Sequence, residues 1–115
     1  GIDSGPILAE RRFEIPDGCF IGELYQLTFG KSVALFKDTL GPLIANDLSP
    51  IPQNERNGIK SELHFRKEIN DLKIISPDWA GEKIKRYVRA TAMPGFPPPY
   101  MMVEGKKIEF RISDA

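Results

Sequence analysis

The sequence has 115 residues with 16 basic and 16 acidic side chains, so its formal net charge is zero. Hydrophobic residues make up 41% and charged residues 28%, the balance of an ordinary globular protein and not of a disordered or fibrous one. A zero net charge supplies no overall field that would attract nucleic acid or an anionic membrane, although a local patch can still exist. The apolar runs are far too short to span a bilayer.

Cys19 is the one cysteine, so the chain can form no internal disulfide, as is usual for proteins of a reducing cytoplasm. The opening residues lack both the charge and the apolar run of a signal peptide. They also lack a methionine, which a trimmed or partial chain would explain. We therefore expect a cytoplasmic protein.

The first half of the chain predicts a strand followed by a long helix. Polarity alternates along residues 7–15, which is typical of an edge strand, and Pro16-Asp17-Gly18 predicts the turn that ends it. Apolar residues recur at helical spacing over residues 20–40, and Gly41-Pro42 is the predicted end of this helix. Its internal glycines each cost roughly 1 kcal/mol relative to Ala, so we expect tertiary packing to stabilise it.

The second half predicts a loop, a helix and a hairpin. Residues 48–73 are polar and interrupted by prolines, which indicates a linker or binding loop. A helix is expected from Ser76-Pro77-Asp78 to about residue 92, followed by an extended, proline-rich turn. Residues 100–103 and 106–112 predict a hairpin around Glu104-Gly105. One orphan strand cannot satisfy its own backbone, so we expect an α/β fragment of a larger structure.

Five marks, in order along the chain, resemble the folate-dependent formyltransferase family. The opening Ile2–Ile7 is similar to its Asp-x-Gly-x-Ile segment, and Gly22–Leu27 is similar to its Gly-x-Leu-Tyr-x-x-Leu helix. His64–Lys67 is similar to an aromatic followed by basic residues, and Val88–Ala90 to an Ile-Arg-Ala helix end. Gly105–Ile108 is similar to a Gly-Lys-Lys-Ile turn. Where members often carry Ile-Asp-Trp, this sequence has Ile-Ser-Pro at residues 75–77.

The resemblance implies the C-terminal portion of a formyltransferase. Residues 1–47 would end the Rossmann-like catalytic domain, residues 48–73 would form a linker, and residues 74–115 would begin a C-terminal subdomain. Asp3 would be catalytic, and the co-substrate 10-formyltetrahydrofolate would lie near Gly1, Ile2, Ser4 and Gly5. The family's catalytic Asn and His precede the aspartate motif and are not in this sequence, so we expect no activity from this chain alone.

Formyl transfer to an amine needs a neutral nucleophile, a stabilised oxyanion and a proton acceptor. By resemblance, Asp3 would orient the family's His and assist proton transfer. The alternative is that Asp3 only bonds backbone amides in a turn, as Asp does routinely. With the resemblance, we favour the active-site interpretation.

The resemblance also implies partners: the folate co-substrate, an amine acceptor and the remainder of the formyltransferase domain, with a homodimer left open. A nucleotide-linked aminosugar is the predicted acceptor, because the chain has no basic excess suited to tRNA. Methionyl-tRNA is the alternative within the class. A non-catalytic dimerisation or acceptor-binding module is an alternative of another kind.

Several other residues invite functional interpretations. His64 is the one histidine and lies in a polar stretch without a second metal ligand of the His or Cys type, so we expect it to be solvated and predict no metal site. We expect Trp79 and Tyr87 to be core residues, and Phe96 and Tyr100 to be more exposed. We interpret the basic residues of the second helix as a solvated face, namely Lys83, Lys85, Arg86 and Arg89.

Overall fold

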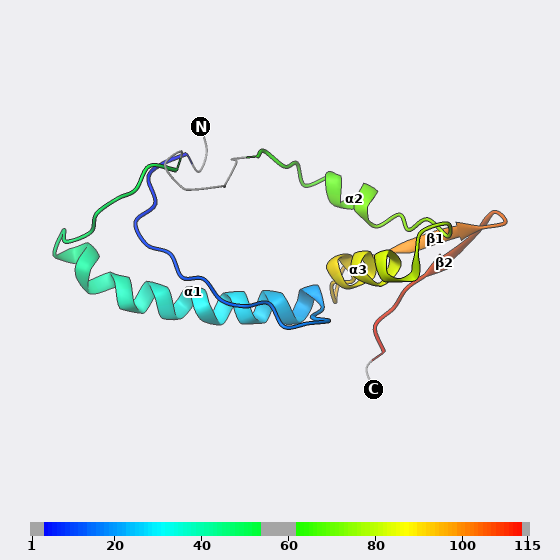
Figure 1. Ribbon diagram of the computed structural model, residues 1–115, viewed down its shortest axis with the longest axis horizontal. Helices are drawn as coiled ribbons and strands as arrows, with labels where there is room; N and C mark the ends of the chain where they lie inside the picture. Colours follow the sequence, from blue (N-terminus) through cyan, green and yellow to red (C-terminus); the bar gives the residue numbers. More distant parts are fainter. Residues whose placement is uncertain (1–3, 54–61, 114–115) are drawn as a thin grey trace. The chain divides into compact units, whose positions relative to one another are not determined.

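The computed structural model describes residues 4–53 and 62–113, and it divides into two compact units. Unit 1 comprises Gly1–Glu14 and Leu27–Leu63, and unit 2 comprises Ile15–Gln26 and His64–Ala115. The order of elements is α1, α2, α3, β1 and β2 (Figure 1). The long helix α1 (Ile21–Ile44) contributes residues to both units.

A tight turn and a glutamate set the start of α1. The N–H of Cys19 donates to the Pro16 carbonyl at 3.1 Å, and Gly18 has a φ of 70°, which glycine adopts without steric cost. The N–H of Phe20 then donates to a Glu23 carboxylate oxygen at 2.8 Å. This is the backward half of a capping box, and it also places an acid at the positive end of the helix dipole.

The helix α1 continues through Gly41-Pro42, so the predicted end was wrong. A proline in the last turn removes only one of the final helical bonds, and the true stop follows it. Asn46 has a φ of 52°, and its N–H donates to the Leu43 carbonyl at 3.2 Å. The N–H of Asp47 donates to the Pro42 carbonyl at 2.9 Å. These two bonds form a Schellman motif, with Asn46 in the left-handed position that usually belongs to Gly.

Unit 1 combines the C-terminal part of α1 with an extended segment. Ile7 and Ile51 form an isolated antiparallel bridge, but the rest of residues 7–15 forms no strand, so the predicted strand is reduced to one residue. Arg11 pairs with Asp38 of α1 at 2.5 Å. None of the described residues of unit 1 is buried. A strand needs a partner ladder, and the described part of unit 1 offers it one bridge.

Unit 2 has the connectivity of a minimal βαβ unit. Ile74 and Tyr100 form a parallel bridge. The N–H of Ile75 donates to the Tyr100 carbonyl at 2.8 Å, and the N–H of Tyr100 donates to the Lys73 carbonyl at 2.9 Å. The helix α3 (Gly81–Thr91) lies between these segments in sequence, as parallel pairing requires a long connection.

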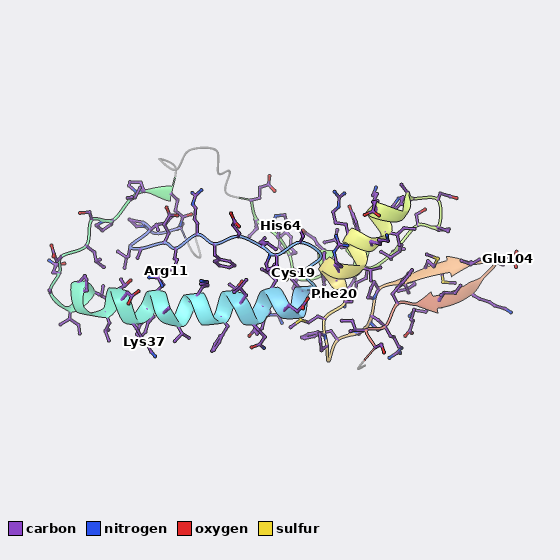
Figure 2. All side chains as sticks on the ribbon, turned by 60° about the horizontal axis from the view of Figure 1, so that its bottom comes forward. Arg11, Cys19, Phe20, Lys37, His64 and Glu104 are labelled. Atoms are coloured by element: carbon purple, nitrogen blue, oxygen red, sulfur yellow. The ribbon has the colours of Figure 1, made fainter. Side chains whose placement is uncertain are left out.

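The predicted hairpin is present, although its second strand ends at Glu109 and not at residue 112. Strands β1 (Tyr100–Val103) and β2 (Lys106–Glu109) pair antiparallel, with Tyr100 opposite Glu109 and Val103 opposite Lys106. The two turn residues have positive φ, 49° for Glu104 and 75° for Gly105, which is the signature of a type I′ turn. Glu104 is labelled at the tip of the hairpin in Figure 2.

The buried residues of the described chain lie in unit 2, around the βαβ connection. Ile75 is 1% exposed and Pro99 is fully buried, and the others are Lys73, Thr91 and Ala92. A short helix, α2 (Glu68–Leu72), lies within the predicted 48–73 loop. The second helix begins at Gly81, later than predicted, because Ser76 instead accepts the N–H of Asp78 in a local turn. Among the described residues, no helix combines the length and apolar character needed to cross a membrane.

Candidate functional site

The predicted active-site segment is described only in part. Gly1, Ile2 and Asp3 lie outside the described residues. Ser4 and Gly5 are exposed, and the Gly5 carbonyl accepts a hydrogen bond of 2.7 Å from the Gln53 side-chain amide. A Cβ added at Gly5 would meet no atom within 4 Å. The predicted contact of Ser4 and Gly5 with the folate therefore stays a prediction.

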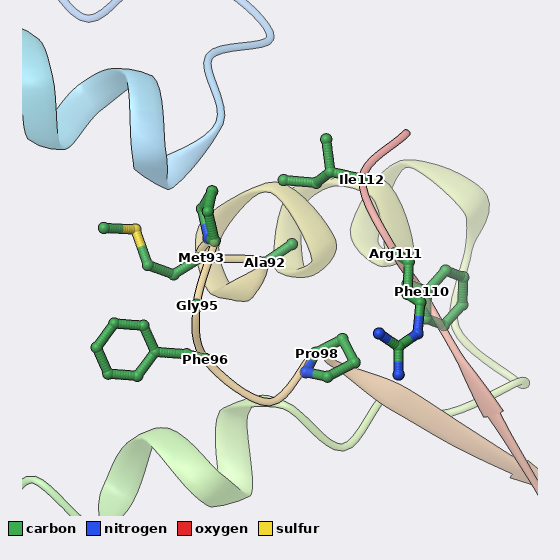
Figure 3. Close-up of a pocket in the computed structure, with 9 residues that line it drawn as sticks. Ala92, Met93, Gly95, Phe96, Pro98, Phe110, Arg111 and Ile112 are labelled. Carbon is green, nitrogen blue, oxygen red and sulfur yellow. The ribbon is translucent and has the colours of Figure 1, made fainter. Parts of the chain in front are cut away.

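A cavity of about 440 Å³ lies beside the proline-rich turn of unit 2 (Figure 3). It combines apolar walls with one cation, the guanidinium of Arg111, which pairs with Glu109 at 2.5 Å. Phe96 is 64% exposed, as the sequence predicted. The lining residues are Ala92, Met93, Pro94, Gly95, Phe96, Pro98, Phe110, Arg111 and Ile112.

A second and more apolar cavity of about 650 Å³ shares Met93, Pro94 and Ile112 with the first. The start of α1 contributes Gly22, whose added Cβ would lie 3.2 Å from Pro94 Cδ. A side chain at this position would therefore crowd the proline. The other lining residues are Phe20, Glu23, Tyr25 and Gln26.

Sequence reasoning missed both cavities, although the proline-rich turn was itself a signal. Prolines disfavour both helix and strand, so the proline-rich segment forms a loop. This loop connects the preceding helix to the hairpin. The residues after the hairpin, Phe110 to Ile112, carried no sequence signal of a site. They reach the cavity because the Phe110 N–H donates to the Pro99 carbonyl at 2.8 Å.

Trp79, which lies just before α3, and Tyr87 of α3 form an aromatic cluster. The Trp79 and Tyr87 rings lie 4.7 Å apart at 55°, and the ammonium of Lys83 lies 4.2 Å from the Trp79 ring centroid. A cation over an aromatic face is attracted by its quadrupole. Trp79 and Tyr87 are half-buried, close to the predicted core role. Lys83 packs on the rings, whereas Lys85 pairs with exposed Glu82, as on a solvated face.

His64 is 70% exposed and lies 2.9 Å from a Glu68 carboxylate oxygen. The backbone N–H of Phe65 donates to the other carboxylate oxygen at 2.9 Å. These bonds, the backbone one foremost, lower the pKa of the Glu68 carboxyl below its ordinary value of 4.5. The arrangement closes the turn that precedes α2. Among residues 4–53 and 62–113, no group of three His, Cys, Asp or Glu side chains is placed to hold a metal ion.

No protein-family model and no curated protein matches this sequence. Two solved structures are similar to it. The first is a 4-N formyltransferase from Francisella tularensis, with a TM-score of 0.78 and 21% identity over 97% of this chain and 46% of that chain. The second is a sugar N-formyltransferase from a Shewanella species, with a TM-score of 0.75 and 21% identity over 98% of this chain and 46% of that chain.

These similarities confirm the predicted resemblance at the level of the fold. At such low identity, what the two proteins share with this chain is architecture. The chain spans less than half the length of the structures that it matches. Nearly all of this chain therefore has the fold of one portion of the N-formyltransferases.

Proposed function

We propose that this chain is part of a 10-formyltetrahydrofolate-dependent N-formyltransferase that acts on the amino group of a nucleotide-linked aminosugar. The observation that carries the proposal is the fold similarity over 97% and 98% of the chain to two N-formyltransferases. It agrees with the five short motifs of the sequence, at an identity of only 21%. The Rossmann-like assignment of residues 1–47 and the cytoplasmic location are parts of the same proposal.

The chemical role that we assign to this chain is assistance in removing one proton from the attacking amine. The co-substrate would supply the formyl carbon, and the amine would attack that carbon as a neutral nucleophile. The new bond between the amine nitrogen and the formyl carbon replaces the bond from that carbon to the folate nitrogen, so tetrahydrofolate leaves and takes up a proton. The nitrogen must then lose a proton, and a carboxylate beside a histidine can hold that histidine in the tautomer that accepts it. Asp3 is the carboxylate that the family motif places there. By the same motif, Gly1, Ile2, Ser4 and Gly5 would lie along the folate, and the exposure of Ser4 and Gly5 leaves them accessible to it.

The preference for a sugar acceptor rests on two observations. One of the two similar structures is a sugar N-formyltransferase. The zero net charge also offers no general attraction for a polyanion such as tRNA. A tRNA acceptor remains the second candidate, and the two are separated by assaying formyl transfer to a nucleotide-linked aminosugar and to methionyl-tRNA.

The decisive experiment replaces Asp3 in a polypeptide extended by the residues that are encoded upstream of Gly1. We expect Asp3→Asn to lower kcat by roughly 10²- to 10⁴-fold, the usual range for a positioned acid–base group. The melting temperature should change little. The matched control is Asp47→Asn, an exposed residue of the same unit, which should leave kcat unchanged.

Survival of activity in Asp3→Asn would make Asp3 a structural turn residue. The 115-residue chain alone is expected to transfer no formyl group, because the family's Asn and His are not in its sequence. Measurable turnover by it would overturn the residue assignment. An extended polypeptide that is stable but transfers no formyl group would favour a non-catalytic binding or dimerisation module.

A further inference from the structure

A third cavity of unit 2 combines apolar walls with two basic side chains, and it contains none of the residues assigned to formyl transfer. Its volume is about 380 Å³, and its lining comes from the turn before α1, from α3 and from the residue after β2. Four of the side chains that line it are apolar, and each of these is half-buried. We call this cavity the α3 groove. Its side chains are those of Phe20, Ile84, Lys85, Val88, Arg89 and Phe110.

Arg89 differs from the other basic residues of α3 in having no partner. Lys83 and Arg86 lie over aromatic rings, and Lys85 pairs with the exposed Glu82. Among residues 4–53 and 62–113, the Arg89 side chain forms no ion pair, hydrogen bond or aromatic contact. Arg89 is nevertheless half-buried, so the predicted solvated face does not extend to it. It is the cation of the α3 groove that is left for a ligand.

The local structure does not explain why an unpaired Arg89 is half-buried. Burial removes hydrating water from a charged group, and this costs free energy unless a counter-charge replaces the water. Arg89 lies in the last turn of α3, where the helix dipole favours a cation. The dipole would favour an exposed cation equally, so it does not account for the burial of Arg89 beside apolar side chains. An anion bound in the α3 groove would supply the missing counter-charge.

We propose that the α3 groove binds a small organic anion that has an aromatic body and one carboxylate. The carboxylate would accept two parallel hydrogen bonds from the Arg89 guanidinium, an arrangement that this planar group favours. The aromatic body would pack against the rings of Phe20 and Phe110, since ring contacts add stabilisation beyond the burial of area. The volume of about 380 Å³ lies within the usual range for small-molecule sites.

The test titrates the 115-residue chain with naphthoate and follows its backbone amides by nuclear magnetic resonance. We expect saturable chemical-shift changes confined to residues that line the α3 groove, such as Gly18, Val88 and Arg89. Two further probes separate the parts of the ligand. Naphthalenemethanol keeps the rings but is neutral, so it should bind roughly tenfold more weakly, as expected when a charge-assisted hydrogen bond is lost. Acetate keeps the carboxylate without the rings and should cause no saturable change at the same concentrations.

A pair of variants on one helix tests the role of the guanidinium. Arg89→Gln should weaken naphthoate binding by roughly tenfold and leave the binding of naphthalenemethanol unchanged. The matched control is Arg86→Gln, which removes a cation of α3 that does not line the groove and should change the affinity by less than about twofold. Circular dichroism checks that each variant is folded. Arg89→Lys keeps the charge without the planar fork, so its affinity should lie between, and it serves as the test if Arg89→Gln does not fold.

Three results would contradict the inference. The first is equal affinity for naphthoate and naphthalenemethanol, and the second is equal weakening by Arg86→Gln and Arg89→Gln. Either would show that Arg89 packs its methylene stem on the apolar residues while its charged end stays in water. The third is a set of shift changes located elsewhere in the chain, or none that saturates. Since the α3 groove contains none of the residues assigned to formyl transfer, each of these results leaves the proposed function standing.

Discussion

Units 1 and 2 differ in what their side chains bury. Unit 2 buries Ile75 to 1% exposure beneath a βαβ connection, and it closes a hairpin with local turn chemistry. Unit 1 has the longer part of α1, which ends in a Schellman motif, but no buried residue among those described. Helical stability in proteins comes mainly from packing of an apolar face. The comparison teaches that local signals can define helices and a hairpin, whereas strand pairing and a core depend on how many layers are present.

The largest expected effect comes from truncating the same residue type in each unit. In the 115-residue chain, Ile75→Ala should cost about 2–5 kcal/mol of unfolding free energy, because it leaves a cavity in the core of unit 2. Trp79, the one tryptophan in the sequence, lies in unit 2 and reports its unfolding by fluorescence in urea. Ile44→Ala, at a position that is 78% exposed, should change that transition by less than about 0.5 kcal/mol. An equal loss of unfolding free energy in the two variants would contradict the difference between the units.

A smaller effect is expected at the end of α1. Asn46 holds a φ of 52°, which Asn tolerates better than residues with other side chains. Asn46→Ala should therefore reduce the stability of the helix end by about 1 kcal/mol, whereas Asn46→Gly should be neutral or slightly stabilising. Circular dichroism during thermal melting measures both variants. Equal behaviour of Ala and Gly would show that the Schellman motif contributes nothing to unit 1.

Two glycines of α1 sharpen the comparison further. A Cβ at Gly30 would meet no atom within 4 Å, so Gly30→Ala should stabilise the helix in the chain alone by up to about 1 kcal/mol. At Gly22 the added Cβ would lie 3.2 Å from Pro94 Cδ, so Gly22→Ala should gain less or lose stability. Thermal unfolding followed by circular dichroism compares the two. A larger gain in stability from Gly22→Ala than from Gly30→Ala would show that the proline-rich turn can move away from the added methyl group without cost.

The smallest effect is expected from acid. The folded-state pKa of Glu68 lies below its ordinary value of 4.5, so its contribution is fully present above that value. It should be lost as pH falls through the lowered pKa, where protonation weakens the bonds to Phe65 and His64. Side-chain chemical shifts of Glu68 measured between pH 6 and pH 2 should titrate below 4.5. A Glu68 titration at or above its ordinary value would refute the lowered pKa.

Much of unit 2 could be predicted from local sequence. Glu104-Gly105 predicted the hairpin because a two-residue turn requires positive φ at both positions, which Gly adopts readily. The second helix was also predicted, although Ser76 begins a turn before it and not the helix itself. The parallel bridge between Ile74 and Tyr100 had no local signal, since parallel pairing depends on residues far apart in sequence.

Unit 1 was harder to predict, for two physical reasons. Pro42 predicts a helix end, but in the last turn of α1 it removes only one backbone hydrogen bond. The helix is instead ended by Asn46, which has a positive φ. Residues 7–15 have the alternation of a strand, yet a strand forms only with a partner, and the described chain supplies one bridge at Ile7. Of the candidate site, Ser4 and Gly5 are exposed, and their contact with the folate stays a prediction, as does the role of Asp3.

The parallel bridge of unit 2 has a consequence for the order in which this unit folds. The hairpin closes a loop of two residues and α3 forms from neighbours in sequence, so both can appear within microseconds. Joining Ile74 to Tyr100 closes a much longer loop, whose entropy must be offset by the burial of Ile75 and Pro99. We therefore expect the bridge to be the late step, and synthesis past Tyr100 to be required before this core can close.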